Sequence, residues 1–353
     1  MISRRNLLCA MGSFVGLGAN GSAVAQNRTI KVLTHANILH VHVPGATAIS
    51  EVFPTLGPYT VELRRFEKLQ ELTRSLIASD ADICYTDTTT VMAATSAGAD
   101  LRIIGQLYAN VDLAFCVNAD KVNTLQDLTK SDVIVGVNST GDITHAVMVA
   151  VLNKYKLDPK RVRILGLGGS SSRMRALLSG RVHCVPVHID QAAALAKQGN
   201  FKVLIKPWTE FAFFSNEIWA VRADWLKVKA NQRVAVDVLK AQLIANGKAN
   251  ADFAWYADRY RKFSTDKGAA SSSDAEINEE WVLLRNEVKS WPAPMTLSQS
   301  DYAQLLPSFQ LAGVPTDKVD INKLIDDSFL KQAQKELDTR SAPPIKTEIN
   351  HDN

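Results

Sequence analysis

Cysteine is scarce in this 353-residue chain, which contains only Cys9, Cys84, Cys116 and Cys184. Their spacing matches neither a zinc site nor a disulfide framework. The last three lie in apolar runs, so we expect them to be small, buried hydrophobic side chains. One bridge between Cys84 and Cys116 stays open as an alternative in an oxidising compartment.

Long apolar runs and a strong surplus of charge are also missing. The net charge of +4 would fall to +2 without Arg4 and Arg5. Such a small surplus does not indicate electrostatic attraction to nucleic acid or to an anionic membrane. No segment of the mature chain approaches the ~20 apolar residues that a membrane-spanning helix needs. We therefore expect a globular monomer without a nucleic-acid partner or an integral membrane span.

The familiar catalytic motifs are absent from the sequence. It has no Gly-x-Ser-x-Gly elbow, no phosphate-binding Gly-x-x-x-x-Gly-Lys-Ser/Thr loop and no His-Glu-x-x-His helix. The Gly-Leu-Gly-Gly run at residues 166–169 is a lone glycine cluster and not a dinucleotide fingerprint. The sequence thus favours a protein that is not an enzyme and carries no cofactor.

The two ends of the chain are predicted to lie outside the folded part. Arg4 and Arg5 precede a weakly apolar, Gly-rich stretch that ends in Ala23-Val24-Ala25, the small residues that a signal peptidase requires. Residues 1–25 are therefore predicted to be a cleaved export signal, of the twin-arginine type rather than the ordinary Sec type, which sends the chain to the periplasm. The polar, Pro-interrupted residues 341–353 are expected to form a flexible tail.

Between the ends, short β-branched runs alternate with segments of helical period, a pattern typical of α/β layering around a largely parallel sheet. Strands are expected at 29–33, 59–63, 81–85, 101–106, 111–117, 133–137, 162–165, 182–187, 203–205 and 219–221. Helices are expected at 68–78, 88–97, 143–155, 172–179, 234–247, 251–263, 275–289 and 321–337. Two such units could form two lobes around a cleft.

A succession of loose motifs follows this order of elements, at residues 76–82 (LIASDAD), 88–90, 97–102, 136–141, 157–162 and 176–182. In this order the chain resembles the substrate-binding proteins of nitrate/sulfonate/taurine-type ABC importers. The resemblance implies a type II periplasmic-binding-protein fold. Residues 27–117 with 218–340 would form lobe 1, and residues 118–214 would form the inserted lobe 2.

The resemblance also implies a function, namely capture of a small oxyanionic organic solute in the periplasm and its delivery to an ABC transporter permease in the inner membrane. Two other roles stay open, as a ligand-binding sensor component or as a binder of a metal or metal chelate. The same superfamily resembles the fungal-type pyrimidine synthases, whose Cys-rich motif is missing here.

Three helix starts are candidates for the ligand site, because helix N-termini beyond strand ends present free N–H groups to a cleft. They are Asp87-Thr88-Thr89, then Ser139-Thr140-Gly141-Asp142, and the segment that leads to Arg173. At the first, a plain helix cap is the alternative. At the second, the Asp142 carboxylate competes with an anionic ligand for the same donors.

Five histidines could face one cleft: His35, His40, His42, His145 and His188. Imidazoles with carboxylates suit Zn, Ni or Cu, but the His-x4-His-x-His spacing is no standard metal pattern, and no metal ligands are predicted. The predicted ligand-binding residues are His35, Asn37, Asp87, Thr88, Thr89, Ser139, Thr140, Gly141, Asp142, Arg173, His188, Asp190 and Phe214, the last as a possible apolar wall.

Overall fold

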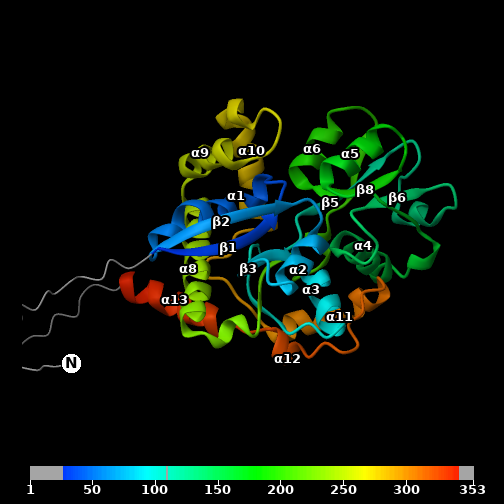
Figure 1. Ribbon diagram of the computed structural model, residues 1–353. Helices are drawn as coiled ribbons and strands as arrows, with labels where there is room; N and C mark the ends of the chain where they lie inside the picture. Colours follow the sequence, from blue (N-terminus) through cyan, green and yellow to red (C-terminus); the bar gives the residue numbers. More distant parts are fainter. Residues whose placement is uncertain (1–26, 109, 342–353) are drawn as a thin grey trace, which may run out of the picture.

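The computed structural model describes residues 27–108 and 110–341. The predicted export signal at residues 1–25 and residues 342–353 of the predicted tail lie outside this part of the chain. Two five-stranded sheets, each covered by helices, form the described structure (Figure 1). No helix in the described residues is long and apolar enough to cross a membrane.

The first sheet has the strand order β2-β1-β3-β10-β4. Its strands are β1 (Arg28–His35), β2 (Tyr59–Phe66), β3 (Ile83–Asp87), β4 (Leu101–Gln106) and β10 (Glu217–Arg222). Strands β1, β2 and β3 run parallel, whereas β10 is antiparallel to both of its neighbours. The chain therefore leaves this sheet after Gln106 and returns to it at Glu217 in β10, after an excursion of about a third of its length.

The second sheet has the order β7-β6-β8-β5-β9. Its strands are β5 (Leu113–Asn118), β6 (Ile134–Val137), β7 (Arg163–Gly166), β8 (Cys184–His188) and β9 (Phe201–Ile205). Here β5 is the antiparallel strand, paired with β8 and β9. Both sheets are thus mixed, and the prediction of a largely parallel sheet is corrected at β5 and β10, the strands by which the chain enters one sheet and returns to the other.

Helices connect the strands and cover the sheets. Those before β10 are α1 (Val43–Thr47), α2 (Leu69–Ile77), α3 (Thr88–Ser96), α4 (Ile143–Lys154), α5 (Ser170–Leu178), α6 (Ile189–Ala196) and α7 (Pro207–Glu210). Those after it are α8 (Lys229–Ala251), α9 (Phe253–Phe263), α10 (Asp274–Leu283), α11 (Gln299–Leu311), α12 (Ile321–Leu324) and α13 (Ser328–Ser341).

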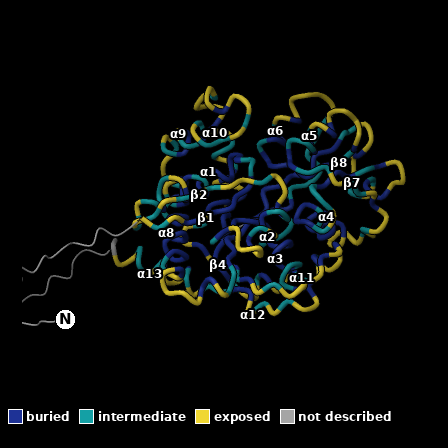
Figure 2. Tube along the Cα trace, viewed as in Figure 1, coloured by how far each residue is buried: buried dark blue, intermediate teal, exposed yellow. Residues whose placement is uncertain are grey.

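The apolar periodicity explains how these helices pack. In α2, Leu72 and Leu76 are fully buried while Arg74 on the other face is exposed, and the helix packs against β3. Burial of each leucine side chain contributes ~1.5–3 kcal/mol. The buried residues continue through the strands of both sheets, and exposed residues gather on the outer loops and helix faces (Figure 2).

Most of the expected strands and helices are confirmed within a few residues. The sequence analysis missed α6, α11 and the helical residues 40–55. Helix α11 has Pro307 inside it, which hides its pattern, and residues 40–55 combine two short 3₁₀ turns, α1 and a π-helical turn. The single helix expected at 321–337 is broken into α12 and α13.

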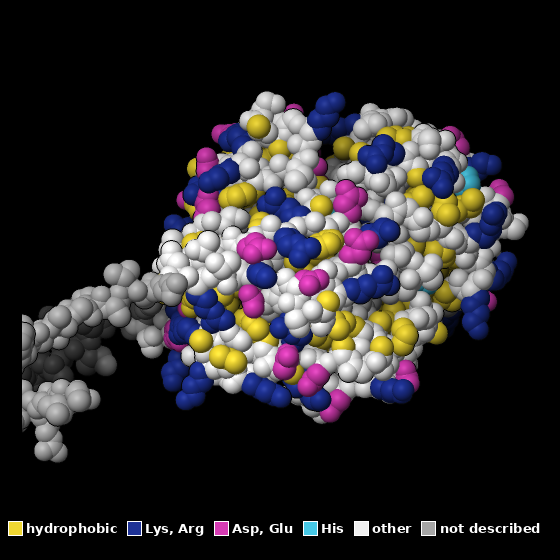
Figure 3. Space-filling model, in the orientation of Figure 1, with side chains coloured by type: hydrophobic (Ala, Val, Ile, Leu, Met, Phe, Trp, Pro, Cys, Tyr) yellow, Lys and Arg dark blue, Asp and Glu magenta, His cyan; other side chains and the backbone are white. Residues whose placement is uncertain are grey.

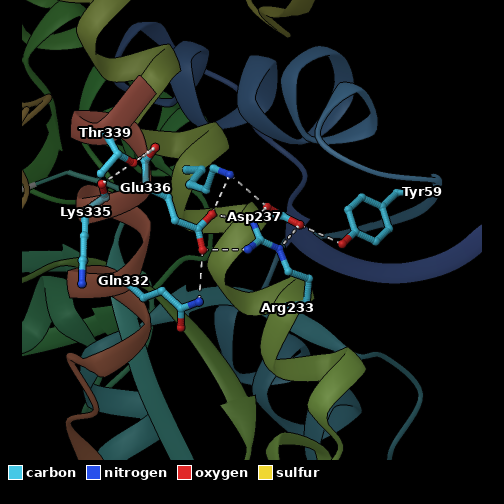
Figure 4. A network of polar contacts seen from close by, with 8 residues as sticks. Tyr59, Arg233, Asp237, Gln332, Lys335, Glu336 and Thr339 are labelled. Carbon is cyan, nitrogen blue, oxygen red and sulfur yellow. Dashed lines mark hydrogen bonds and ion pairs between the residues drawn. The ribbon is translucent and has the colours of Figure 1, made fainter. Parts of the chain in front are cut away.

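The C-terminal helix α13 is fixed to α8 by a network of charged side chains (Figure 4). Arg233 forms ion pairs with Asp237 and, at 2.7 Å, with Glu336 of α13. Lys240, only 1% exposed, pairs with the Asp237 carboxylate at 3.4 Å and with Glu336 at 3.0 Å, and Tyr59 of β2 donates a hydrogen bond to Asp237. The Asp237 carboxylate therefore joins β2, α8 and, through its cations, α13.

We predict that Asp237→Asn lowers the free energy of unfolding by about 3 kcal/mol, because it leaves the buried Lys240 ammonium undercompensated. The measurement is urea unfolding followed by circular dichroism. Asp327→Asn is the matched control, since Asp327 pairs with Lys331 in an exposed position, and it should change stability by less than about 0.5 kcal/mol. Equal effects of the two substitutions would contradict the central role of Asp237.

Candidate functional site

A narrow cavity lies where strand ends of the two sheets meet, and we call it the intersheet cavity. Residues near the ends of β1 and β10 line one wall, and residues after β6, in α4 and α5, and at the end of β8 line the other. The polar side chains used below are His35, Asn37, Ser170, Arg173, His188, Asn216 and Glu217. This is the place at which open α/β sheets hold ligands, outside the strand ends.

The two walls touch at the edge of the intersheet cavity. A Cβ atom at Gly169 would lie 3.1 Å from the Asn37 side-chain nitrogen, so the backbone of one wall lies directly against a side chain of the other. Gln70 of α2 donates a hydrogen bond of 3.5 Å to the Ser139 hydroxyl. The two sheets are therefore close together at this edge, which makes the cavity between them narrow.

The predicted ligand-binding residues at the start of α3 form hydrogen bonds with other residues of the protein. The buried Asp87 carboxylate accepts hydrogen bonds from the Thr90 backbone N–H at 2.9 Å and from the Thr89 hydroxyl. The Thr88 hydroxyl lies 2.9 Å from that of Ser215. Burial raises the pKa of Asp87, although these hydrogen bonds oppose the shift. Asp87 and Thr89 therefore build the cap of α3, while the Thr88 hydroxyl ties the helix start to Ser215 and to the Asn216 carbonyl.

The start of α4 is occupied by a carboxylate of the chain itself. Asp142 accepts hydrogen bonds from the backbone N–H groups of Ser139 and His145, both at 3.1 Å, and from the Thr144 hydroxyl. Burial raises its pKa to about 6. Gly141 adopts a φ of 82°, which favours glycine, and Thr140 is exposed. The donors expected for a ligand anion at this turn thus already hold Asp142.

The start of α5 differs, because its N-cap residue is Gly169 and no side chain caps the helix. Ser170 and Arg173 of this helix are buried and line the cavity. The Arg173 guanidinium donates to the carbonyls of Pro186 at 2.8 Å and Gly168 at 2.7 Å, which fixes its plane. Its Nη2 group makes no hydrogen bond with any described residue.

Burial lowers the pKa of Arg173 to about 10, so the guanidinium keeps its charge at neutral pH. A fixed guanidinium beside an uncapped helix N-terminus is the combination that binds a carboxylate, sulfonate or phosphate group. Of the three predicted helix starts, α5 is the one that offers free donors to the intersheet cavity.

Two of the five histidines, His35 and His188, line the intersheet cavity, and His42 lies next to both of them. The ring centroids of His35 and His42 are 6.3 Å apart, and those of His42 and His188 are 5.3 Å apart. His188 forms a 2.7 Å hydrogen bond through Nδ1 to Asp112, which leaves its Nε2 atom on the side of the cavity. The Asp112 carboxylate therefore fixes the orientation of the His188 ring.

The other two histidines have different surroundings. His40 stacks on Tyr260 with a centroid distance of 3.9 Å and hydrogen-bonds the Tyr256 hydroxyl, and burial lowers its pKa to about 3. His145 accepts a hydrogen bond from the Gly141 N–H at 3.0 Å. Among residues 27–108 and 110–341, no three His, Cys, Asp or Glu side chains are grouped closely enough to hold a metal ion.

Two further predicted residues lie away from the walls of the intersheet cavity. Phe214 is 1% exposed and packs against Phe211 and Phe309. Asp190, in the first turn of α6, lines a separate surface depression together with Asp266 and Glu280. We call these three carboxyl groups the rim cluster.

The sequence analysis missed Asn216, Glu217 and Asp112, although all three lie at or beside the cavity. Glu217 begins the otherwise apolar strand β10 and is 4% exposed. A lone carboxylate at the start of an apolar strand was the available signal. The cysteine expectation is confirmed, because Cys84, Cys116 and Cys184 are buried and free.

Comparison with solved structures identifies the fold as that of periplasmic binding proteins. The alkanesulfonate-binding protein SsuA from Xanthomonas axonopodis, bound to MOPS, is 16% identical, with a TM-score of 0.68 over 86% of this chain and 100% of that chain. The periplasmic nitrate-binding protein NrtA from Synechocystis has 14% identity, a TM-score of 0.71 and coverages of 91% and 92%.

The zinc-bound ligand-binding component of an ABC-type import system from Staphylococcus aureus is also similar, with 14% identity, a TM-score of 0.70 and coverages of 87% and 99%. At these identities the likeness shows the fold alone, and it confirms the predicted α/β class with two lobes. No protein of curated function matches the chain in sequence.

The model of the NMT1/THI5-like family matches residues 61–245, which is more than half of the chain. The chain therefore belongs to the NMT1/THI5-like family. The predicted resemblance to substrate-binding proteins of ABC importers is confirmed at the level of family and fold.

The rim cluster predicts a pH dependence of stability. Burial, and then the charge of Asp266, raise the pKa of Asp190 to about 7, while burial, and then Asp190, raise that of Glu280 to about 8. A carboxyl group whose pKa is higher in the folded chain binds more protons there, so stability falls as pH rises toward the folded pKa. The lowered pKa values of His35, His40 and His145 work in the opposite direction, but their effect above pH 7 is small because an unfolded histidine has already lost most of its proton there.

We expect the free energy of unfolding to fall by roughly 1 kcal/mol between pH 7 and 8, a figure discounted for the partial exposure of Glu280. The measurement is urea unfolding at several pH values in this window. The double substitution Asp190→Asn with Glu280→Gln should flatten the curve, whereas Asp258→Asn, which changes an exposed carboxylate on α9, should not. A slope that persists in the double variant would contradict the assignment.

Proposed function

We propose that this chain is a periplasmic solute-binding protein that captures a small oxyanionic organic solute and delivers it to the permease of an ABC importer. One observation carries the proposal: the uncapped N-terminus of α5 and the fixed guanidinium of Arg173 face a cavity between the two lobes. Membership of the NMT1/THI5-like family and the fold of importer binding proteins support it. The same proposal includes the division into two lobes: residues 27–117 with 218–340 form lobe 1, and residues 118–214 form lobe 2. The chain would pass between the lobes near β5 and β10.

The mechanism follows from the position of the cavity. A solute that contacts both walls stabilises the closed arrangement only through contacts that exist when the lobes are together. Arg173 and Ser170 contribute from the second sheet, and His35 and Asn37 from the loop after β1. The closed form would then present its outer surface to the permease, and on the face shown in Figure 3 basic and acidic side chains are interspersed.

A thermal-shift screen of the purified protein against sulfonates, carboxylates, nitrate and aromatic acids tests the proposal. A ligand at ~100 times its Kd should add about 2.7 kcal/mol to the apparent stability. We expect at least one class of organic acid to raise Tm in a concentration-dependent way. Silence from every acid, with the unliganded protein well folded, would contradict the proposed function.

For an acid found in this screen, we predict that Arg173→Lys weakens binding at least tenfold. Lysine keeps the positive charge but loses the planar, bidentate donor geometry and the fixed orientation. The measurement is isothermal titration calorimetry, with Tm of the unliganded variant as a check on folding. Arg175→Lys is the matched control, since Arg175 is exposed on the same helix. Its affinity should equal that of the wild type, and equal losses in both variants would exclude Arg173 from the site.

A further inference from the structure

The three carboxyl groups of the rim cluster come from two different parts of the molecule. Asp190 lies in the first turn of α6, which packs against β5, β8 and β9 of the second sheet. Asp266 follows α9, and Glu280 lies on α10; α9 packs against α1 and α8, and α10 packs against α9. The cluster therefore spans the depression between α5 and α6 on one side and α9 and α10 on the other (Figure 1).

The side of α9 and α10 is attached to the first sheet. The Thr265 N–H, next to Asp266, donates a hydrogen bond of 2.9 Å to the carbonyl of Ile38 in the segment after β1. The Ser264 hydroxyl donates to the same carbonyl at 3.1 Å. In the proposed division into lobes, Asp266 and Glu280 thus belong to lobe 1 and Asp190 belongs to lobe 2, so movement of the lobes would change the distances within the rim cluster.

The carboxyl groups of the rim cluster have few partners. Asp266 accepts hydrogen bonds from the hydroxyls of Ser264 at 3.4 Å and Tyr260 at 3.5 Å, both long for such bonds. The Oε2 atom of Glu280 is buried and has no hydrogen-bond partner in the described structure. In the part of the chain that the structure describes, no ion pair joins a cationic side chain to Asp190, Asp266 or Glu280.

The other charged groups around the depression compensate the rim cluster only weakly. Its cations are exposed to solvent, which screens their charges, and its histidine stays neutral because burial lowers its pKa to about 3. Of the two further carboxylates, one caps α10 through Ser273. From the interior, two histidines and one carboxylate act on the cluster at longer range. In the same order, these groups are Arg175, Lys197 and Lys267; His40; Glu276 and Glu279; and His42, His188 and Asp112.

The carboxyl groups also act on one another across the depression. Besides burial, which is the larger cause, the charge of Asp266 raises the pKa of Asp190, and the charge of Asp190 raises that of Glu280. In both pairs the two groups come from opposite sides. Separation of the sides would admit water and remove the like charge, so each pKa would fall toward its ordinary value. The closed arrangement therefore holds protons that an open arrangement would release.

We propose that the rim cluster is a pH-sensitive latch between the lobes, which lets α6 and α10 lie together when it is protonated and drives them apart when it is ionised. The inference rests on the proposed function and adds its regulation: the closed protein retains its solute at neutral and lower pH and releases it more readily as the pH rises. Because the solute and the protons both favour the closed arrangement, each strengthens the binding of the other.

The first test needs no solute. Small-angle X-ray scattering of the unliganded protein measures its radius of gyration at pH 7 and pH 9, and circular dichroism confirms that the protein stays folded. We expect a larger radius at pH 9, because ionisation of the rim cluster favours the open arrangement. The double substitution Asp190→Asn with Glu280→Gln should keep the smaller radius at both pH values. Asp258→Asn, an exposed carboxylate on α9, is the control and should behave as the wild type does.

The second test uses an acid found in the thermal-shift screen. Calorimetry at pH 7 and pH 9 should show a Kd that rises at least tenfold in the wild type, because each proton taken up on closure can weaken binding by up to about tenfold per pH unit. Sulfonates and carboxylates stay ionised throughout this window. The double variant leaves the titrating groups of the intersheet cavity unchanged, so the loss of most of the pH dependence in this variant would assign the effect to the rim cluster.

A radius of gyration that is equal at pH 7 and pH 9 in the wild type overturns the inference, and so does an increase that the double variant retains. A pH-independent Kd also overturns it while the proposed function stands. Failure of the proposed function is a different result, namely that no organic acid binds the folded protein at either pH, and the scattering measurement still decides whether the rim cluster is a latch.

Discussion

Compensation of buried charge is the constraint on which the centre of this molecule depends. Three helices start beside the meeting point of the two sheets, and each brings unsatisfied N–H groups to a place that excludes most water. Asp87 satisfies those of α3, and Asp142 satisfies those of α4. At α5 the N-cap is Gly169, which has no side chain to accept hydrogen bonds. The N–H groups of the first turn of α5 therefore need an acceptor from outside the helix.

The need to compensate buried charge also bears on the charged side chains around the cavity. Placing two capping carboxylates close to the cavity makes its surroundings acidic, and the charge of Asp87 contributes to the raised pKa of Asp142. The guanidinium of Arg173 offsets part of this charge. Glu217 places a further carboxyl group in the opposite wall.

Sequence patterns predicted the elements of this fold better than its site. Hydrophobic period locates a strand or helix because burial of one face is a local requirement, and the starts of α3 and α4 were placed correctly for that reason. Whether Asp142 turns back to its own helix depends on its rotamer and on the burial that surrounds it, which the spacing of residues does not contain. Similarly, the pair Asp112–His188 joins residues far apart in sequence through the register of β5 on β8.

Helix α11 adds a mechanical consequence to the connection between the sheets. The chain crosses between them twice, before β5 and before β10, and α11 packs beside both routes. Its Tyr302 hydroxyl accepts a hydrogen bond from Ser215, its Phe309 ring packs on Phe214, and the helix contacts α4 beneath the second sheet. A third connection of this kind resists twisting and sliding more than it resists bending, so any relative movement of the proposed lobes would be a rotation about the α11 side. The contact between Asn37 and Gly169, on the cavity edge, would then part before the core of either lobe is disturbed.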